Sequence, residues 1–418
     1  MIAPPRLKND CFALPPGVDW APVDDALAHL ESVVHPVVTA EDIPLADAAG
    51  RILAEDAVAR RAHPPAANSA VDGYGFAHAR TTGDGVQILP LVEGRAAAGL
   101  PYDGAVPPGY AIRILTGAIV PDGVDTVVLE EDVTAEGGRI AFHGGLKSGA
   151  NTRAAGEDVA AGATAFPAGT RLRPQELALL AAIGIATVTV YKPLRIGVLS
   201  TGDEIVTEDA GRGQIYDANR PMLLALIADW GYTPVDLGHV PDDRAALKAR
   251  FAQAATEVDA ILTSGGASAG DEDHVSALLR ETGSMGLWRI AIKPGRPLAL
   301  AMWDGVPVFG LPGNPVAAFV CTLVFAAPVF RVLAGGVWKA PAGVTVPAAF
   351  TKSKKPGRRE YLRARLDAGG AAEAFKSEGS GRISGLSWAE GLVEIEDGAR
   401  EIQPGDPVRY IPFESFRQ

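Results

Sequence analysis

The sequence has 418 residues, of which 47% are hydrophobic and 21% charged, and its formal net charge is −12. These proportions are typical of a globular chain of about three domains, and the negative charge argues against a protein that binds nucleic acid over a broad surface. The two cysteines, Cys11 and Cys321, exclude a disulfide scaffold and a cysteine-rich zinc site.

The N-terminal residues 1–8 contain no apolar segment, so we expect no signal peptide. The most apolar run, residues 316–330, includes Pro328 and is shorter than the roughly 20 residues that span a bilayer. We therefore expect a cytoplasmic protein without a membrane anchor, in which this run is a buried helix and Cys321 is a packing residue.

The first part of the chain changes its pattern at a proline-rich breaker, residues 63–69. Apolar spacing before the breaker predicts helices at 23–35 and 43–59, and a proline-initiated helix is predicted at 174–183. Short apolar runs between glycines predict strands at 86–92, 110–115, 126–129 and 139–142. This pattern indicates a β-rich domain inserted into an elongated, discontinuous first region.

A regular alternation of strands and helices begins near residue 193. Strands are predicted at 196–199, 234–237, 260–263, 288–292 and 306–309, and helices at 221–230, 243–255, 273–282 and 315–333. Alternation of this kind predicts a doubly wound parallel sheet with helices on both faces. After residue 336, strands predicted at 349–351, 361–366, 392–395 and 408–411 indicate a small C-terminal barrel.

The segment 260–274 combines an apolar strand, a turn at Gly265 and Gly266, and acidic residues ahead of a helix. Glycine permits the turn, and the helix N-terminus offers unpaired N–H groups at the positive end of its dipole. Asp271 and Asp273 would repel a bare phosphate, so a bridging Mg²⁺ is the simpler interpretation. The alternative is an ordinary connection in which aspartates cap the helix.

Two further apolar strands end in comparable turns. Residues 195–204 end in Asp203 and Glu204, and residues 308–315 end with Asn314 as the helix N-cap and Pro315 as the first helical residue. Because the carboxyl ends of parallel strands meet at one edge of a sheet, the three turns predict a single crevice.

Eight short motifs recur in a characteristic order. They are NSAVDGY (68–74), LTGA with DTVV (115–128), GANTRAAGED (149–158), STGDE (200–204), GQIYDAN (213–219), SGGASAGDED (264–273), KPGRP (293–297) and GLPGNP (310–315). In order and spacing they resemble the MoeA family of molybdopterin molybdenumtransferases, which includes the E domains of gephyrin and of the plant Cnx proteins. The resemblance extends from about residue 23 to the C-terminus.

The resemblance implies four domains: an elongated discontinuous domain (11–65 and 147–190), the inserted β-rich domain (66–146), a MogA-like α/β molybdopterin-binding domain (191–336) and a C-terminal β-barrel (337–418). It implies Mg²⁺-dependent insertion of molybdate into adenylylated molybdopterin, with release of AMP. It also implies a homodimer in which the β insertion of one subunit faces the α/β crevice of the other. A molybdopterin-adenylylating enzyme and molybdoenzyme acceptors are the expected partners.

The acidic residues of the crevice suit a magnesium-dependent cleavage of the substrate's pyrophosphate. Hard cations take carboxylate oxygens, and a cation neutralises charge on the bridging and leaving oxygens. The expected metal residues are Asp203, Glu204, Asp271 and Asp273; N-capping is the alternative for Asp203. Expected catalytic residues are Glu204 and Asp271, together with Asp72, Thr116 and Asp158; a structural turn is the alternative for Thr116 and Asp158.

Molybdate is a small dianion that needs compact cationic and N–H donors. Lys293 and Arg296 supply two cations across a Pro-Gly turn, although lysine is more usual in the family at position 296, and a solvated turn is the alternative. Arg358, Arg363 and Ser380 match family positions in the barrel that contact oxyanion, and a solvated basic strand edge explains them equally well. The remaining expected substrate-binding residues, chiefly phosphate-cradling, are Gly265, Gly266, Ser268, Gly313, Asn314 and Pro315.

Two other functions are compatible with part of the pattern. One is the preceding adenylyl transfer, for which a lone α/β domain is expected. The other is a non-catalytic molybdopterin-binding scaffold, which Asp72, Glu204, Asp271 and Lys293 argue against, because clustered carboxylates repel one another without a ligand. No residue distinguishes molybdate from tungstate.

Overall fold

The computed structural model describes residues 20–417 except 266–273, 282–284, 288–289 and 296–297. The chain forms two compact units: Glu41–Val190 is one, and the preceding and following residues together form the other. Each unit is described separately below.

A six-stranded sheet forms the β-rich part of the Glu41–Val190 unit. Its order is β7-β4-β6-β5-β9-β8, with β4 (Gly73–Phe76), β5 (Val86–Ala96), β6 (Ala111–Ile114), β7 (Thr126–Leu129), β8 (Thr134–Glu136) and β9 (Arg139–His143). The four predicted strands are confirmed, whereas β8 and β4 were not predicted; all residues of β4 are buried. Gly73 is required there, because a Cβ would lie 1.9 Å from the Val128 carbonyl oxygen.

Three short strand pairs and the α-helix α2 lie outside this sheet in the same unit. β1 (Ala40–Pro44) pairs with β12 (Thr187–Tyr191), β2 (Ala57–Val58) with β11 (Thr164–Phe166), and β3 (Asn68–Ser69) with β10 (Thr152–Arg153). The predicted helix at 174–183 is confirmed as α2 (Pro174–Ala182). These pairings bring the two distant segments of the region together.

The predicted helix at 43–59 is wrong. β1 ends at Pro44, the single-turn helix η1 (Leu45–Asp47) follows, and Gly50 has a positive φ of 76°. The apolar residues Ala48 and Leu53, which suggested a helical face, are buried in a core that also includes Leu172 and Leu180 from the second segment. Their spacing therefore reflects packing from an irregular backbone.

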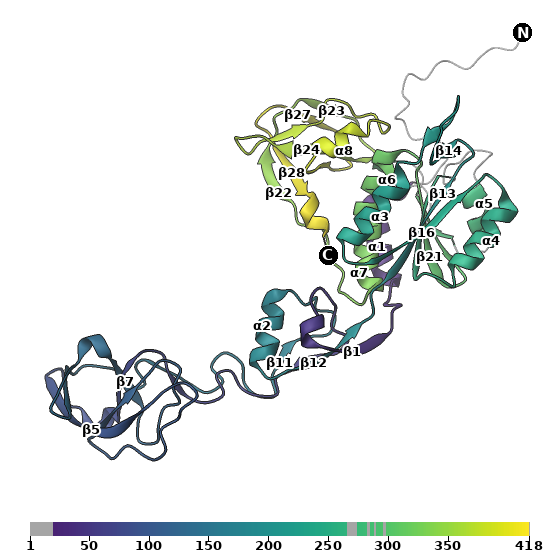
Figure 1. Ribbon diagram of the computed structural model, residues 1–418. Helices are drawn as coiled ribbons and strands as arrows, with labels where there is room; N and C mark the ends of the chain where they lie inside the picture. Colours follow the sequence, from purple (N-terminus) through teal and green to yellow (C-terminus); the bar gives the residue numbers. More distant parts are fainter. Residues whose placement is uncertain (1–19, 266–273, 282–284, 288–289, 296–297, 418) are drawn as a thin grey trace, which may run out of the picture. The chain divides into compact units, whose positions relative to one another are not determined.

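A mixed six-stranded sheet lies at the centre of the other unit (Figure 1). Its order is β16 (Thr233–Val240), β13 (Arg195–Thr201), β17 (Ala260–Ser264), β21 (Val306–Leu311), β20 (Ala299–Trp303) and β18 (Met285–Leu287). The first four strands are parallel to one another, as predicted. β20 is antiparallel to β21, and β18 is antiparallel to β20. Neither β20 nor β18 was predicted.

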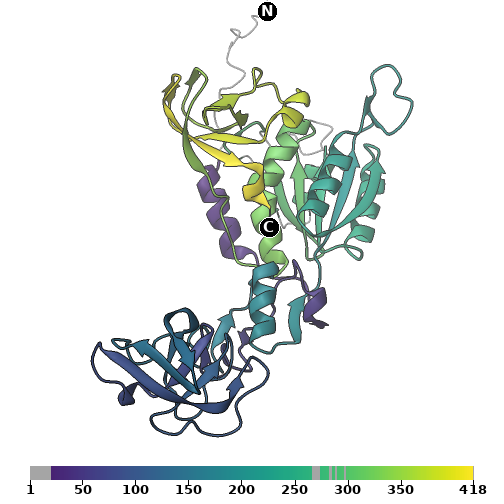
Figure 2. The ribbon, with the colours of Figure 1, turned by 60° about the vertical axis from the view of Figure 1, so that its left-hand side comes forward.

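Helices cover both faces of this sheet, which confirms the doubly wound arrangement. α3 (Asn219–Asp229) and α6 (Pro315–Cys321) lie on one face, and α4 (Arg244–Ala254) and α5 (His274–Glu281) lie on the other (Figures 1 and 2). The apolar layer beneath α4 and α5 includes Phe251, which stacks on Trp303 with ring centroids 5.4 Å apart.

Helical structure continues from α6 through η4 (Thr322–Ala326) to α7 (Ala327–Leu333). Among the described residues this 19-residue stretch, Pro315–Leu333, is the one helix long and apolar enough to cross a membrane, but 83% of its most apolar window is buried within the chain. It is a core helix, as predicted. Cys321 is buried in it, and burial raises the pKa of its thiol to about 12.

The C-terminal region is the predicted small barrel, in which two sheets enclose one core. One sheet has the order β19-β24-β26-β28-β22 with β25 beside β24, and the other pairs β23 with β27. Leu362, Val393 and Ile402 from both sheets share the core. The strands are β19 (Ile292–Lys293), β22 (Val344–Pro347), β23 (Lys352–Lys354), β24 (Arg359–Leu366), β25 (Ala372–Ala374), β26 (Gly391–Ile395), β27 (Arg400–Ile402) and β28 (Pro407–Pro412).

Two predicted strands near this region are wrong. Residues 349–351 lie between β22 and β23, outside any strand. The strand predicted at 288–292 is also wrong, although residues 288–289 lie outside the described part of the chain. The strand found there, β19, pairs in parallel with β24, so that Lys293 lies opposite Glu360. Lys293 is therefore connected by sequence to the α/β domain but hydrogen-bonded into the C-terminal sheet.

The first helix, α1 (Val23–Val33), confirms the prediction for 23–35 and belongs to the same unit. Asp24 in its first turn accepts two hydrogen bonds from Arg359 of β24, at 2.6 and 2.7 Å. The paired guanidinium holds the pKa of Asp24 below its usual value, although partial burial acts in the opposite direction.

Candidate functional site

The carboxyl ends of β13, β17 and β21 lie side by side, as predicted. Ser200 of β13 pairs with Ser264 of β17, which in turn pairs with Leu311 of β21. The turn after β17 is tight: Gly265 has a φ of 97°, and a Cβ there would lie 2.4 Å from the Thr201 carbonyl oxygen. Gly313 approaches the same turn, because its Cβ would lie 3.9 Å from the Gly265 Cα.

Asn219 holds these turns together. Its side chain is buried at the start of α3, and its Nδ2 donates to Ser264 Oγ at 2.6 Å and to the Gly313 carbonyl at 2.7 Å. One amide therefore connects the end of β17 with the loop that leads to α6. The sequence contained this asparagine in the GQIYDAN motif, but its role was not predicted.

The edge also contains buried polar atoms that have no hydrogen-bond partner within the described part of the chain. They are Ser200 Oγ, Thr201 Oγ1, Thr263 Oγ1 and Asn219 Oδ1. Most buried polar groups in proteins are hydrogen-bonded. These atoms lie at the carboxyl edge of a parallel sheet, where ligands of α/β proteins bind, and their chemistry suits a polar ligand.

Two carboxylates expected in the crevice follow β13. Asp203 Oδ1 accepts a hydrogen bond from the Asp242 N–H at 3.0 Å, and Asp242 Oδ2 accepts one from the Asp203 N–H at 3.3 Å. Asp203 therefore connects the turn after β13 to the loop after β16 and does not cap a helix. Asp242 is a further acidic residue at this edge, which the sequence motifs did not indicate. The Glu204 carboxylate folds over Gly202, whose Cβ would lie 2.4 Å from Glu204 Oε2.

The expected magnesium site is only partly visible. Asp271 and Asp273 lie outside the described residues, as do Gly266, Ser268 and Arg296. Within the described residues no group of three histidine, cysteine or carboxylate side chains is close enough to hold a metal ion. The side chains that the structure places at this edge, Asp203, Glu204 and Asp242, offer oxygen donors, which are the type that Mg²⁺ prefers.

Asp72 and Thr116 meet in the β-rich domain. Asp72 precedes β4 and Thr116 follows β6, which is antiparallel to β4, so the two residues are brought opposite each other. Asp72 Oδ1 accepts hydrogen bonds from Thr116 Oγ1 and from the Thr116 N–H, both at 2.6 Å. These donors lower the pKa of the exposed Asp72 carboxyl from its usual value. The predicted catalytic roles of Thr116 and Asp72 stay predictions.

Replacing this hydroxyl is expected to change the titration of Asp72. In Thr116→Val, the pKa of Asp72 rises toward its ordinary value because the side-chain donor is lost while the backbone donor remains. NMR titration of the Asp72 carboxyl carbon measures the shift, with Thr134→Val on exposed β8 as a control. The pair's contribution to stability is present above the ordinary pKa and is lost as pH falls through the lowered one. An unchanged Asp72 titration would contradict the assignment.

Asp158 is exposed in the same unit, and its backbone N–H donates to the His63 carbonyl at 3.1 Å. The structure thus places the backbone of Asp158 beside the breaker segment. Its predicted catalytic role stays a prediction.

Lys293 forms ion pairs with two carboxylates. Its Nζ lies 2.5 Å from Glu378 Oε2 and 3.4 Å from Glu360 Oε1. Lys352 Nζ contacts the same two carboxylates, 2.9 Å from Glu360 Oε2 and 2.5 Å from Glu378 Oε1. The four side chains form a closed ring of alternating charge, which the sequence analysis did not anticipate.

The barrel residues expected at an oxyanion site are largely buried. Arg358 and Arg363 are 8% and 4% exposed, so a solvated basic edge is excluded. Arg363 donates to the carbonyls of Ser377, Gly379 and Arg382 and thereby fixes the loop that carries Glu378.

This loop also reaches the start of α6. The Ser380 carbonyl accepts a hydrogen bond from the Val316 N–H at 3.3 Å, and a Cβ on Gly381 would lie 3.9 Å from Asn314 Oδ1. Asn314 is the N-cap residue and Pro315 the first helical residue of α6, as predicted. A small pocket lined by Lys293, Val316, Arg363 and Ser377, among others, lies at this junction. The structure thus brings Lys293 and Ser380 to the same helix start as Gly313 and Asn314.

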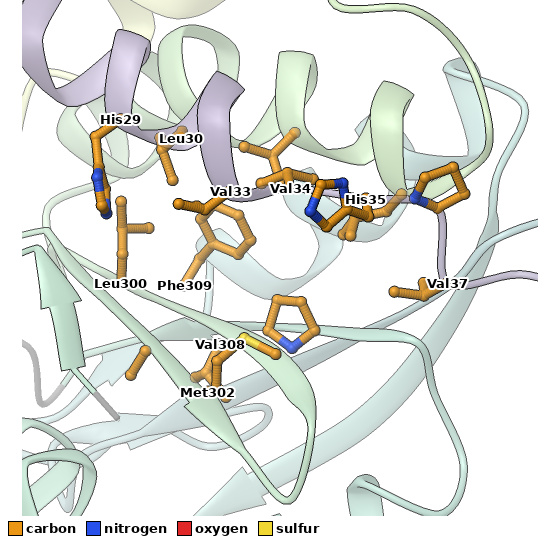
Figure 3. A pocket seen from close by; sticks show the side chains of 15 residues that line it. His29, Leu30, Val33, Val34, His35, Val37, Leu300, Met302, Val308 and Phe309 are labelled. Atoms are coloured by element: carbon orange, nitrogen blue, oxygen red, sulfur yellow. The ribbon is translucent and has the colours of Figure 1, made fainter. Parts of the chain in front are cut away.

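A larger pocket lies elsewhere in the unit and is chemically different. It is lined by α1, including Leu30 and Val33, and by Leu300, Met302 and Phe309 of β20 and β21 (Figure 3). Apart from His29 and His35, its lining side chains are apolar. A surface of this type does not suit a phosphate or an oxyanion.

Comparisons with known proteins agree with this geometry. Residues 21–184 match the MoeA N-terminal region (domain I and II), residues 197–332 match a probable molybdopterin binding domain, and residues 345–413 match the MoeA C-terminal region (domain IV). The chain is 37% identical over 395 residues to the molybdopterin molybdenumtransferase of Haemophilus influenzae, covering 92% of this chain and 96% of the relative. The enzyme of that name from a Nostoc species is 34% identical, with 88% and 87% covered.

Solved structures agree as well. A crystal structure of the molybdopterin biosynthesis moeA protein from Pyrococcus horikoshii OT3 superimposes with a TM-score of 0.82 at 28% sequence identity, covering 94% of this chain and 100% of the other. The chain is therefore a transferase and belongs to the MoeA family, whose curated relatives here are named molybdopterin molybdenumtransferases.

Proposed function

We propose that this protein inserts molybdate into adenylylated molybdopterin in a Mg²⁺-dependent reaction that releases AMP, as a step of molybdenum cofactor biosynthesis. The observation that carries the proposal is the junction at the start of α6. There the polar edge of β13, β17 and β21 meets a pocket that contains Lys293 and Arg363. A phosphate-bearing substrate and an oxyanion would thus bind next to each other.

The phosphate side of the site relies on backbone donors and on rigid turns. Gly265 and Gly313 let the backbone approach a ligand closely, and Asn219 fixes both turns through the hydrogen bonds to Ser264 and Gly313. α6 begins at Pro315, directly after the N-cap residue Asn314, and the positive end of its helix dipole favours negative charge there. We assign the terminal phosphate or the pyrophosphate of the substrate to this place, with Gly266 and Ser268 completing the cradle.

The metal side of the site relies on carboxylates. Glu204, Asp271 and Asp273, with Asp203 holding the adjoining loops, are the residues that would bind Mg²⁺. The ion would neutralise charge on the bridging and leaving oxygens as the pyrophosphate bond breaks. Molybdenum itself is substrate, and the dithiolene sulfurs of molybdopterin bind it, so the chain needs no thiolate.

The assembly that we propose is a cytoplasmic homodimer of four-domain subunits with the domain bounds given above. In it, Asp72 and Thr116 approach the crevice of the neighbouring subunit, and Asp158 contributes to the substrate contacts. A molybdopterin-adenylylating enzyme would supply the substrate, and molybdoenzymes would accept the product.

The reaction is tested with purified protein and adenylylated molybdopterin. AMP is expected to appear when both molybdate and Mg²⁺ are present, and chelation of Mg²⁺ by EDTA is expected to reduce its release by at least about a hundredfold. AMP release that is indifferent to molybdate would overturn the proposal. Formation of adenylylated molybdopterin from ATP and molybdopterin would indicate the preceding adenylyl transfer instead.

A further inference from the structure

The ring formed by Lys293, Lys352, Glu360 and Glu378 places two ammonium groups on one shared pair of carboxylates. Glu378 bridges them, with Oε2 at 2.5 Å from Lys293 Nζ and Oε1 at 2.5 Å from Lys352 Nζ. A bridging carboxylate uses two oxygens of one anion to contact two cations. An oxyanion such as molybdate offers the same arrangement with more charge.

The two carboxylates of the ring differ in how firmly they are held. Glu360 lies on β24 and its side chain is 11% exposed, whereas Glu378 lies on a loop and its side chain is 44% exposed. The lysine side chains are as well buried as Glu360, with 14% exposed for Lys293 and 8% for Lys352. Glu378 is therefore the one member that can turn into solvent while the other three stay in place.

The loop itself does not have to unfold for this to happen. Arg363 holds the backbone on both sides of Glu378 through the carbonyls of Ser377 and Gly379, and its guanidinium lies 5.0 Å from the centre of the Phe375 ring. Only side-chain torsions of Glu378 need to change, and rotations of exposed side chains are fast.

We propose that Glu378 occupies the oxyanion position between Lys293 and Lys352 until substrate binds, and that the incoming dianion displaces it, with Lys352 acting as a second cation for the oxyanion. The inference deepens the function proposed above and rests on it. It identifies an internal competitor that sets the affinity for the oxyanion, and a lysine that no family motif pointed to.

Charge balance supports the exchange. With Glu378 in place the ring is neutral, so it has no net attraction for an anion. When Glu378 turns away, two positive charges and the fixed Glu360 remain, and the net charge of +1 favours a dianion. Burial alone would raise the pKa of Glu378, but the hydrogen bonds from Lys293 and Lys352 lower it overall, so the competitor is ionised near neutral pH.

The competitor is tested by isothermal titration calorimetry of sodium molybdate into the full-length protein at fixed ionic strength. Glu378→Gln is expected to bind molybdate about tenfold more tightly than the wild type, because a negative charge beside the ligand is removed. Glu373→Gln is the matched control, since Glu373 lies in the same domain but pairs with Arg365 at 3.0 Å. It is expected to leave the affinity unchanged.

The second cation is tested in the same way. Lys352→Gln is expected to weaken molybdate binding about tenfold. Lys376→Gln, which removes an equal charge from an exposed position on the loop that carries Glu378, is expected to leave it unchanged. In steady-state AMP release, Glu378→Gln should lower KM for molybdate with kcat little altered. A change in fold would instead alter both, and circular dichroism checks for it.

The results separate this inference from the proposed function. If Lys293→Gln weakens molybdate binding but Glu378→Gln matches the wild type, the oxyanion pocket stands and Glu378 is no competitor. If Glu378→Gln binds more tightly but AMP release does not depend on molybdate, the competitor stands and the reaction is wrong. If neither wild type nor Glu378→Gln binds molybdate, both the pocket and the competitor are wrong.

Discussion

Glu204→Gln is expected to reduce AMP release by about 10³-fold while the protein stays folded. The substitution keeps the size of the side chain but removes the negative charge that we assign to the metal at the end of β13. Glu204 is exposed at this edge and its carboxylate lies over Gly202. Loss of the charge therefore affects ligand binding and chemistry rather than core packing.

The matched control for this change is Glu208→Gln, an exposed glutamate four residues further along the chain. It is expected to retain wild-type activity, since its position has no counterpart among the proposed metal residues. Turnover and circular dichroism should be measured for both variants. Near wild-type turnover in Glu204→Gln would show that the metal site lies elsewhere, and equal losses in both variants would point to a general effect of charge.

Gly265→Ala is expected to destabilise the protein by about 3 kcal/mol and to lower AMP release about a hundredfold. Alanine is strained at the positive φ of 97°, and its Cβ would lie 2.4 Å from the Thr201 carbonyl oxygen, a backbone atom that cannot rotate away. The turn must shift, and a displacement of about 1 Å in a positioning group is enough to cost about 10² in rate.

Gly305→Ala separates strain from crowding. Gly305 also has a positive φ, of 84°, but a Cβ there would meet no atom within 4 Å. This variant is expected to lose only about 1 kcal/mol and to keep its activity. Urea denaturation gives the stabilities and AMP release gives the rates. Equal effects of the two substitutions would show that the close approach of Gly265 to Thr201 is unimportant.

The architecture of the α/β domain was predictable because its signals are local. β13, β17 and β21 are buried apolar runs that end in small-residue turns, and Asn314 with Pro315 marks the start of α6. The hairpin of β20 and β21 was also encoded, since Asp304 and Gly305 both have positive φ, as a two-residue hairpin turn requires. This Asp-Gly signal was overlooked, and the expected all-parallel sheet acquired an antiparallel edge.

The incorrect elements have a different origin. In the 43–59 segment, apolar residues at helical spacing lie in short strands and irregular turns and are buried by residues from another part of the chain, including Leu180 of α2. The spacing of apolar residues shows which positions are buried, but it does not determine the backbone conformation of the segment that carries them. Short barrel strands such as β22 and β23 contain too few residues for a period to emerge, so neither was predicted and a strand was expected between them.

The contacts that define the site were the least predictable. Lys293 was expected to bind an oxyanion, but its carboxylate partners Glu360 and Glu378 lie 67 and 85 residues further along the chain. Asn219 likewise reaches Ser264 and Gly313 over 45 and 94 residues. Spacing rules hold over a few turns of a helix or a few residues of a strand, and side-chain contacts over such separations depend on the completed fold.

The pairing of β19 with β24 has a consequence for the order in which the protein matures. Lys293 leaves the ribosome with the α/β domain, but Glu360, Lys352 and Glu378 are synthesised later. A nascent chain that has completed the turns after β13, β17 and β21 still lacks the partners that orient this lysine. The pocket around Lys293, where we propose that the oxyanion binds, therefore forms only after the C-terminal sheet has been synthesised.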